Sequence, residues 1–84
     1  MAKYTFSENV GPEWSKIADA GDAFVLIQAA TNNETFRIAV ADNVSDLSLA
    51  DGHVITDGAV EFRELAGNLY ARCRQSGSLI VTRY

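Results

Sequence analysis

The stretch Gly67–Tyr84, GNLYARCRQSGSLIVTRY, decides the fold class that the sequence predicts. Apolar and polar side chains alternate over Leu69–Arg74, which is the period of a strand with one buried face. Small and polar residues interrupt the alternation at Gln75–Ser78, and Leu79–Thr82 then continues in β-forming residues. The pattern predicts a β-hairpin at the C-terminus.

Strand-like segments also occupy the middle of the chain. The apolar run Ala23–Ala30 ends at the polar residues Thr31–Glu34 and is followed by Thr35–Ala41, so a hairpin around a polar turn is the simplest interpretation. Apolar residues on both faces of the first run indicate a central strand, or a strand that a partner covers. Two shorter strands are predicted over His53–Ile55 and Ala59–Leu65.

The segment Gly11–Gly21 fits two interpretations. Pro12 suits the first position of a helix and Gly21 suits a helix C-cap, so a short helix over 12–20 is one of them. A short strand leading into the apolar run is the other. We favour the strand, because the segment is too short for a persuasive helix and every other predicted element is a strand.

These segments together predict a single all-β domain over residues 1–84. Its turn signals recur at the spacing of a small antiparallel β-sandwich or barrel of about six to eight short strands, closed by the C-terminal hairpin. Residues 1–12 could belong to this domain or form an extended N-terminal arm.

The size of the chain suggests that it needs help to be stable. A domain of 84 residues buries only roughly 60 to 65% of the surface that its unfolded chain exposes. Its single cysteine, Cys73, and single histidine, His53, supply neither a disulfide nor a set of zinc ligands. Oligomerisation commonly stabilises such domains, so we expect a homo-oligomer, with a closed trimer favoured.

Composition excludes several classes of partner. The net charge of −4 and the pI of about 4.7 disfavour the electrostatic binding of DNA or RNA. No apolar run approaches the roughly 20 residues that span a bilayer, so a membrane protein is not expected. Met1–Phe6 has no apolar signal region, and we therefore expect synthesis in a cytoplasm.

His53 is the natural candidate for acid–base catalysis near neutral pH, with Asp51, Asp57 and Cys73 as conceivable partners. No nucleophile motif surrounds it. The simpler interpretation is a surface histidine at the start of a strand and a buried thiol at Cys73, in phase with its apolar neighbours. We therefore assign no catalytic residue.

The sequence also gives no reason to assign a metal or a cofactor. Four aspartates lie in loop-like segments, where carboxylates can bind Ca²⁺. These are Asp42, Asp46, Asp51 and Asp57, and their spacing matches no EF-hand. The six glycines are single and scattered, so no phosphate-binding loop is present.

Candidate interface residues come from the aromatic and arginine side chains. The set is Trp14, Tyr70, Arg72, Arg74 and Tyr84. A hairpin that buries Leu69, Ala71 and Cys73 would leave the alternate residues of the same strand available to a neighbouring subunit. The alternatives are a solvated edge strand for the two arginines and a place in or beside the core for the aromatic residues.

Several short motifs resemble those of small all-β structural proteins of bacteriophage virions. The motifs are Glu13–Ile17, the apolar strand ending in Gln28, Phe36–Ala41, and Gly67–Arg72 leading to Leu79–Thr82. The most recognisable part is LYAR before a Gly/Ser turn, and the resemblance covers most of residues 13–83. It supplies no catalytic residue, and Cys73–Gln75 departs from the pattern.

The resemblance implies symmetric oligomers that decorate or cement a capsid, or form part of a head or tail fibre. We therefore expect a non-enzymatic, self-assembling structural protein that is located in the virion and bound to capsid or tail proteins. The alternative is a small carbohydrate- or peptide-binding module that uses Trp14 or Tyr70. An enzyme that uses His53 is a more distant third.

Overall fold

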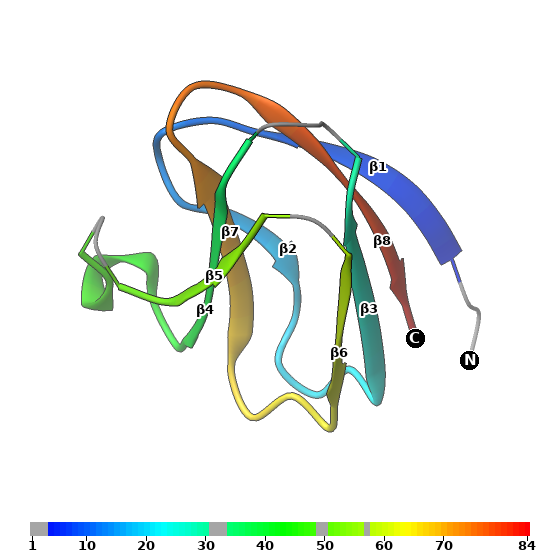
Figure 1. Ribbon diagram of the computed structural model, residues 1–84. Coiled ribbons are helices and arrows are strands. Elements are labelled where there is room, and N and C mark those ends of the chain that lie inside the picture. The colour runs from blue at the N-terminus through cyan, green and yellow to red at the C-terminus, as the bar shows by residue number, and fades with distance from the viewer. Residues whose placement is uncertain (1–3, 31–33, 49–50, 57) are drawn as a thin grey trace.

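The described residues form eight strands in two four-stranded sheets, and all the pairings between these strands are antiparallel (Figure 1). The computed structural model describes residues 4–30, 34–48, 51–56 and 58–84. The strands are β1 (Tyr4–Val10), β2 (Ser15–Ala18), β3 (Phe24–Ala29), β4 (Phe36–Ala41), β5 (His53–Ile55), β6 (Ala59–Arg63), β7 (Asn68–Cys73) and β8 (Gly77–Arg83). A 3₁₀ turn, η1 (Val44–Asp46), precedes β5. The predicted all-β sandwich is confirmed.

The strand order is that of one long hairpin rolled up. One sheet has the order β1-β8-β3-β6 and is called the β8 sheet; the other has the order β2-β7-β4-β5 and is called the β7 sheet. The pairs β1–β8, β2–β7, β3–β6 and β4–β5 are those of a single hairpin whose tip is the connection from β4 to β5. Rolling this hairpin adds the pairs β8–β3 and β7–β4. The result is a jelly roll.

The predicted C-terminal hairpin is wrong in its pairing, although both of its strands form. β7 and β8 lie in different sheets, and the short turn between them crosses from one layer to the other. The hairpin expected from the apolar run into Thr35–Ala41 fails for the same reason, because β3 and β4 also lie in different sheets. Part of its turn, residues 31–33, lies outside the described residues.

Other expectations about the strands hold. The strand favoured for the segment 12–20 is present as β2. The apolar run forms β3, which lies between β8 and β6 and is therefore central in its sheet. Within residues 1–12, Tyr4–Val10 forms β1 and pairs with β8 along its whole length, from Tyr4 opposite Arg83 to Val10 opposite Gly77.

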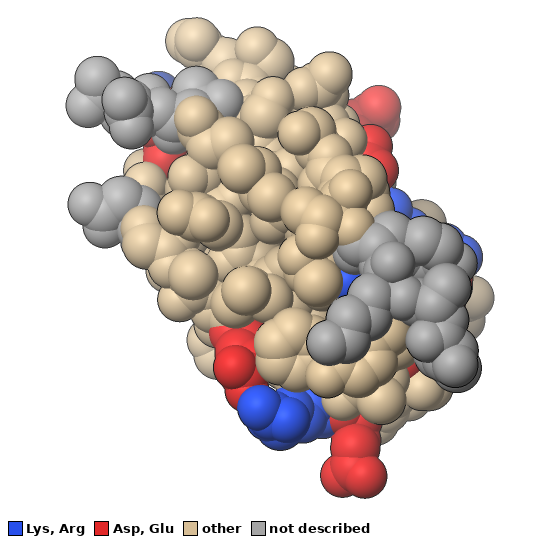
Figure 2. Space-filling view, turned by 90° about the vertical axis from the view of Figure 1, so that its right-hand side faces the viewer, with Lys and Arg blue, Asp and Glu red and all other residues tan. Residues whose placement is uncertain are grey.

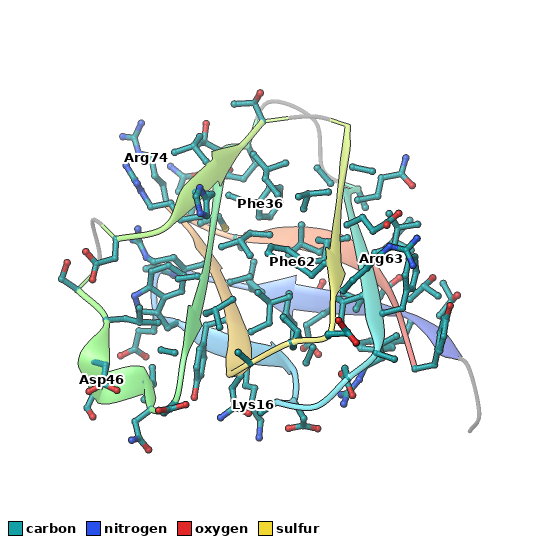
Figure 3. All side chains as sticks on the ribbon, turned by 90° about the horizontal axis from the view of Figure 1, so that it is seen from below. Lys16, Phe36, Asp46, Phe62, Arg63 and Arg74 are labelled. Carbon is teal, nitrogen blue, oxygen red and sulfur yellow. The ribbon has the colours of Figure 1, made fainter. Side chains whose placement is uncertain are left out.

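The core lies between the sheets and is built from alternate residues of the strands. Its fully buried large side chains are Val25, Ile27, Phe36, Ile38, Leu69, Cys73, Leu79 and Val81. Figure 3 shows Phe36 and Phe62 pointing into the space between the layers, while Lys16, Asp46 and Arg74 lie at the outside. Among the described residues no polar or charged residue is buried, so apolar contact dominates the packing.

The turn from β7 to β8 depends on close packing over one ring. A Cβ atom on Gly77 would lie 2.8 Å from Cζ of Phe36, whose own side chain is fully buried. Glycine at position 77 therefore lets the chain pass directly over the ring as it changes sheets.

Leu79 and Ile80 give a test of which face of β8 is buried. Leu79 is fully buried, so Leu79→Ala should lower the free energy of unfolding by about 2–5 kcal/mol. Ile80 points the other way and is 37% exposed, so Ile80→Ala should cost less than about 1 kcal/mol. Urea unfolding of both variants measures the difference, and equal losses would contradict this orientation of β8.

Candidate functional site

The outer face of the β8 sheet carries almost no charge. Because alternate residues of each strand are buried in the core, the residues between them point outward. The described side chains that define this uncharged face are Thr5, Ser7, Asn9, Leu26, Gln28, Ala59, Ser78, Ile80 and Thr82. The strand register places them in rows across the sheet, such as Ser7–Ile80–Gln28–Ala59.

The charged side chains that the structure describes on this side of the molecule lie around its margin. Figure 2 shows the side as a broad area without Lys, Arg, Asp or Glu, with coloured side chains around it. Among the described outward residues of the four strands, Glu61 and Arg63 of β6 are the charged ones. They form an ion pair, with Nε of Arg63 2.7 Å from Oε2 of Glu61, and so neutralise each other.

Polar side chains on the uncharged face form hydrogen bonds with polar side chains of the neighbouring strand. The hydroxyl oxygens of Thr5 and Thr82 lie 2.7 Å apart, and the Ser78 hydroxyl donates to Oδ1 of Asn9 at 2.6 Å. A polar group that is already hydrogen-bonded costs less to remove from water than an unpaired one. This arrangement makes the face suitable for burial against another protein surface.

An aromatic cluster adjoins one end of the face. The rings of Phe24 and Tyr84 stack with centroids 5.2 Å apart, and the guanidinium carbon of Arg63 lies 5.3 Å from the Phe24 centroid. The backbones of Phe24 and Tyr84 also exchange hydrogen bonds, which fixes the rings side by side. Aromatic and arginine side chains supply much of the binding energy at protein interfaces.

The five predicted interface residues are not brought together. The Trp14 indole N–H donates to the Ser48 carbonyl at 3.0 Å, which fastens the connection from β4 to β5. Nε of Arg72 donates to the Pro12 carbonyl at 2.6 Å, and Arg74 is exposed beyond the end of β7. Of the five, Tyr84 is the one that lies in the aromatic cluster.

Tyr70 corrects the expectation that the alternate residues of this strand are open to a neighbour. It is only 7% exposed. β7 is a central strand, and the register places Lys16 and Ala39 on either side of Tyr70.

The residues considered for catalysis or metal binding are also dispersed. His53 is exposed at the start of β5. Cys73 is 1% exposed with its Sγ 3.4 Å from the Val10 carbonyl oxygen, and burial raises the pKa of its thiol. Asp42, Asp46 and Asp51 are exposed, while Asp57 lies outside the described residues. The described part of the chain contains no group of three potential metal ligands.

A groove of about 470 Å³ lies between the edge strands β5 and β6. Its lining is mainly apolar and includes Val54, Ile55, Val60 and Phe62, with His53 beside them. Neither Trp14 nor Tyr70 lines it. No helix in the described residues is long and apolar enough to cross a membrane.

Sequence reasoning missed the uncharged face because no single segment reveals it. Its rows join residues from opposite ends of the chain, such as Ser7 and Ile80. The one local signal is that Thr5, Ser7 and Asn9 alternate with Phe6, Glu8 and Val10, which is a strand pattern with a polar, uncharged side.

Comparisons with known proteins support the fold and leave the function open. No family model matches the chain, and a search of curated proteins finds no significant match. Two solved structures are similar. Protein NMB1881 from Neisseria meningitidis has a TM-score of 0.63 at 12% identity, over 96% of this chain and 72% of that chain. A structure from Bacillus endospore appendages, which form a family of disulfide-linked pili, has a TM-score of 0.57 at 13% identity, over 99% of this chain and 84% of that chain.

A cluster of ion pairs beside the C-terminal strand makes stability depend on pH. Arg83 contacts Asp19 and Asp22 at 2.8 Å each, and Lys16 lies 2.9 Å from Asp19. Hydrogen bonds from Arg83 and then Lys16 hold the pKa of Asp19 below its ordinary value of 3.8. The stabilisation is therefore present above that ordinary value and is lost as the pH falls through the lower pKa of the folded state.

Asp19→Asn should flatten this loss of stability in acid. The difference from the unaltered chain should not exceed about 1 kcal/mol at neutral pH, because the Asp19 side chain is half exposed. Urea unfolding between about pH 7 and pH 2.5 measures it. Asp46→Asn, at an exposed carboxylate of η1, is the control and should lose stability in acid as the unaltered chain does. The same loss of unfolding free energy in acid for Asp19→Asn and the unaltered chain would count against the cluster.

Proposed function

We propose that the chain is a non-enzymatic structural subunit that assembles with copies of itself through the uncharged face of the β8 sheet. The uncharged face is the observation that carries the proposal. The face lacks charge although the chain has a net charge of −4, and depletion of charge is a property of the buried centres of protein interfaces.

Charge explains why two copies would meet at this face. Two chains of net charge −4 repel each other, and the repulsion is weakest where the approaching surfaces carry no unpaired charge. At the margin of the uncharged face, Glu61 and Arg63 of β6 already form an ion pair with each other. The aromatic cluster at its end offers contact area that costs little conformational entropy to order.

Fold similarity is consistent with a structural role. One of the two similar structures comes from Bacillus endospore appendages, which form disulfide-linked pili, and almost the whole of this chain matches it. The most specific form of our proposal is a phage virion, with the chain bound to capsid or tail proteins, because the sequence motifs resemble proteins of that class.

A carbohydrate- or peptide-binding module, the alternative expected from the sequence, would need accessible aromatic residues in a concave site. Tyr70 is buried, and the indole N–H of Trp14 is already bonded to the connection from β4 to β5. Neither lines the groove between β5 and β6. The geometry therefore favours the structural subunit.

Static light scattering over a dilution series tests the proposal. The unaltered chain should form a stable oligomer, and Ile80→Lys should raise the dissociation constant at least about 10-fold, because it places a charge near the middle of the uncharged face. Val54→Lys is the matched control, since Val54 is a β-branched strand residue, 54% exposed, on the other sheet.

The control should leave association unchanged. A chain that stays monomeric at all concentrations would refute self-assembly. An oligomer that resists Ile80→Lys but dissociates with Val54→Lys would move the contact to the β7 sheet.

A further inference from the structure

The uncharged face is smaller than a standard stable interface. Four strands about 4.8 Å apart, of seven, seven, six and five residues at about 3.4 Å per residue, span roughly 400 Å² in projection. A standard stable interface buries about 800 Å² on each partner. A second contact would add to the area that an assembly through this face can bury.

Backbone hydrogen bonds of the last strand show which groups of the β8 sheet are already used. Phe24 and Tyr84 exchange N–H···O bonds in both directions at 3.1 Å, and the Ala30 N–H donates to the Ser78 carbonyl at 2.9 Å. The even-numbered residues from Ser78 to Tyr84 thus direct their backbone N–H and C=O groups to β3. The alternate residues of β8, which include Leu79 and Val81, direct theirs to β1.

The same alternation identifies the free groups of β1. Phe6 and Glu8 lie opposite Val81 and Leu79, so their backbone groups are bonded to β8. The residues between them turn their N–H and C=O groups to the open edge of the sheet. These residues are Thr5, Ser7 and Asn9, and their side chains belong to the uncharged face.

β1 is the least protected of the four edge strands in the described residues, and Glu8, on its inward-facing side, is its one charge of the kind that discourages pairing. β2 has four residues and a register shift between Lys16 and Ala18, and β5 has only three residues. β6 carries Glu61 and Arg63 among its outward residues. β1 has seven residues in unbroken register, with no proline and no outward charge among the described side chains. Such an edge is a template for another strand.

We propose that β1 pairs antiparallel with β1 of a second copy of this chain, about a two-fold axis at Ser7. Ser7 then lies opposite Ser7 of the partner subunit, and Thr5 opposite Asn9 of the partner subunit. Three residue pairs that each exchange two bonds give about six backbone hydrogen bonds. Two four-stranded sheets become one continuous sheet. This inference rests on the proposed function, because it names a contact of the same self-assembly.

Backbone parity and charge select this axis. An axis at Phe6 or Glu8 would bring together groups that are already bonded to β8, and an axis at Glu8 would also oppose two carboxylates. An axis at Ser7 pairs all three open residues with each other and places Glu8 opposite Phe6 of the partner subunit. Glu8 is the one charged side chain among those described in β1, so no like charges meet.

Pairing at the β1 edge and packing at the uncharged face would together build a larger assembly than either contact alone. Each is a contact between identical surfaces, and either one alone closes into a dimer. Both together give each chain two different neighbours, which builds an assembly larger than a dimer. The uncharged face also runs without a break across the joined sheet, which doubles the area that it can present.

Cysteine cross-linking tests the axis directly. In a hydrogen-bonded antiparallel pair the Cα atoms lie about 5.5 Å apart, which suits a disulfide. Ser7→Cys should therefore form covalent dimers under mild oxidation. Thr5→Cys is the matched control, because its own copy would lie about 14 Å away, four residues along the strand. The native Cys73 is buried and does not compete.

Proline substitution tests the backbone contact separately. The N–H of Ser7 is not used within the sheet, so Ser7→Pro should leave cooperative melting intact while abolishing edge pairing. The measured molar mass should fall to that of the complex held by the face alone. Ser7→Ala keeps the N–H and should behave like the unaltered chain. Should Ser7→Pro fail to fold, the cross-linking result decides.

The outcomes separate this inference from the proposed function. Cross-linking by Ser7→Cys at least about 10-fold faster than by Thr5→Cys, with no change in the Ser7→Ala mass, supports the axis. An oligomer that is sensitive to Ile80→Lys but gives equal, slow cross-linking of both cysteine variants overturns edge pairing and leaves the structural subunit standing. A monomer that cross-links at neither position overturns both.

Discussion

The last strand of the chain holds the structure together. β8 lies between β1 and β3, so it links strands from the beginning, the middle and the end of the sequence in one sheet. Its inward residues, Leu79 and Val81, are fully buried in the core, while Ile80 and Thr82 lie in the uncharged face. The same strand therefore supplies the packing that stabilises the fold and the surface to which we assign its function.

The sequence predicts most of the strands correctly but not which strands pair with each other. Alternating side chains correctly located β4 and β7, and runs of apolar or β-forming residues located β3 and β8. Alternation does not specify which strand lies alongside. Pairing with the next segment along the chain closes the shortest loop and so costs the least conformational entropy. For this reason the sequence predicts hairpins. In the jelly roll, burial of both inner faces in one core favours the change of sheets.

The candidate site is less predictable than the fold, because the chemistry of aromatic and arginine residues does not reveal the strand register that decides which of them are exposed. Tyr70 has strands on both sides and is buried, whereas Tyr84 lies against Phe24 at the surface. The uncharged face is defined by the absence of charged side chains at outward positions of four strands, and it becomes visible only when the strands are aligned in the sheet. The position of a residue in the sheet therefore decides its membership of this face more than its chemical type does. A serine such as Ser7 carries no chemical signal of its own, yet it lies at the centre of the proposed edge contact.

Cys73 has a consequence for how this chain can be joined to others. Its thiol lies in the core beside the Val10 carbonyl, and burial raises its pKa, so the reactive thiolate is scarce and sheltered. A covalent link between folded copies cannot begin at this sulfur. For the same reason the thiol reports on opening of the sandwich: a reagent that modifies it must wait for β7 and β1 to separate, so the labelling rate follows how often the core opens to solvent.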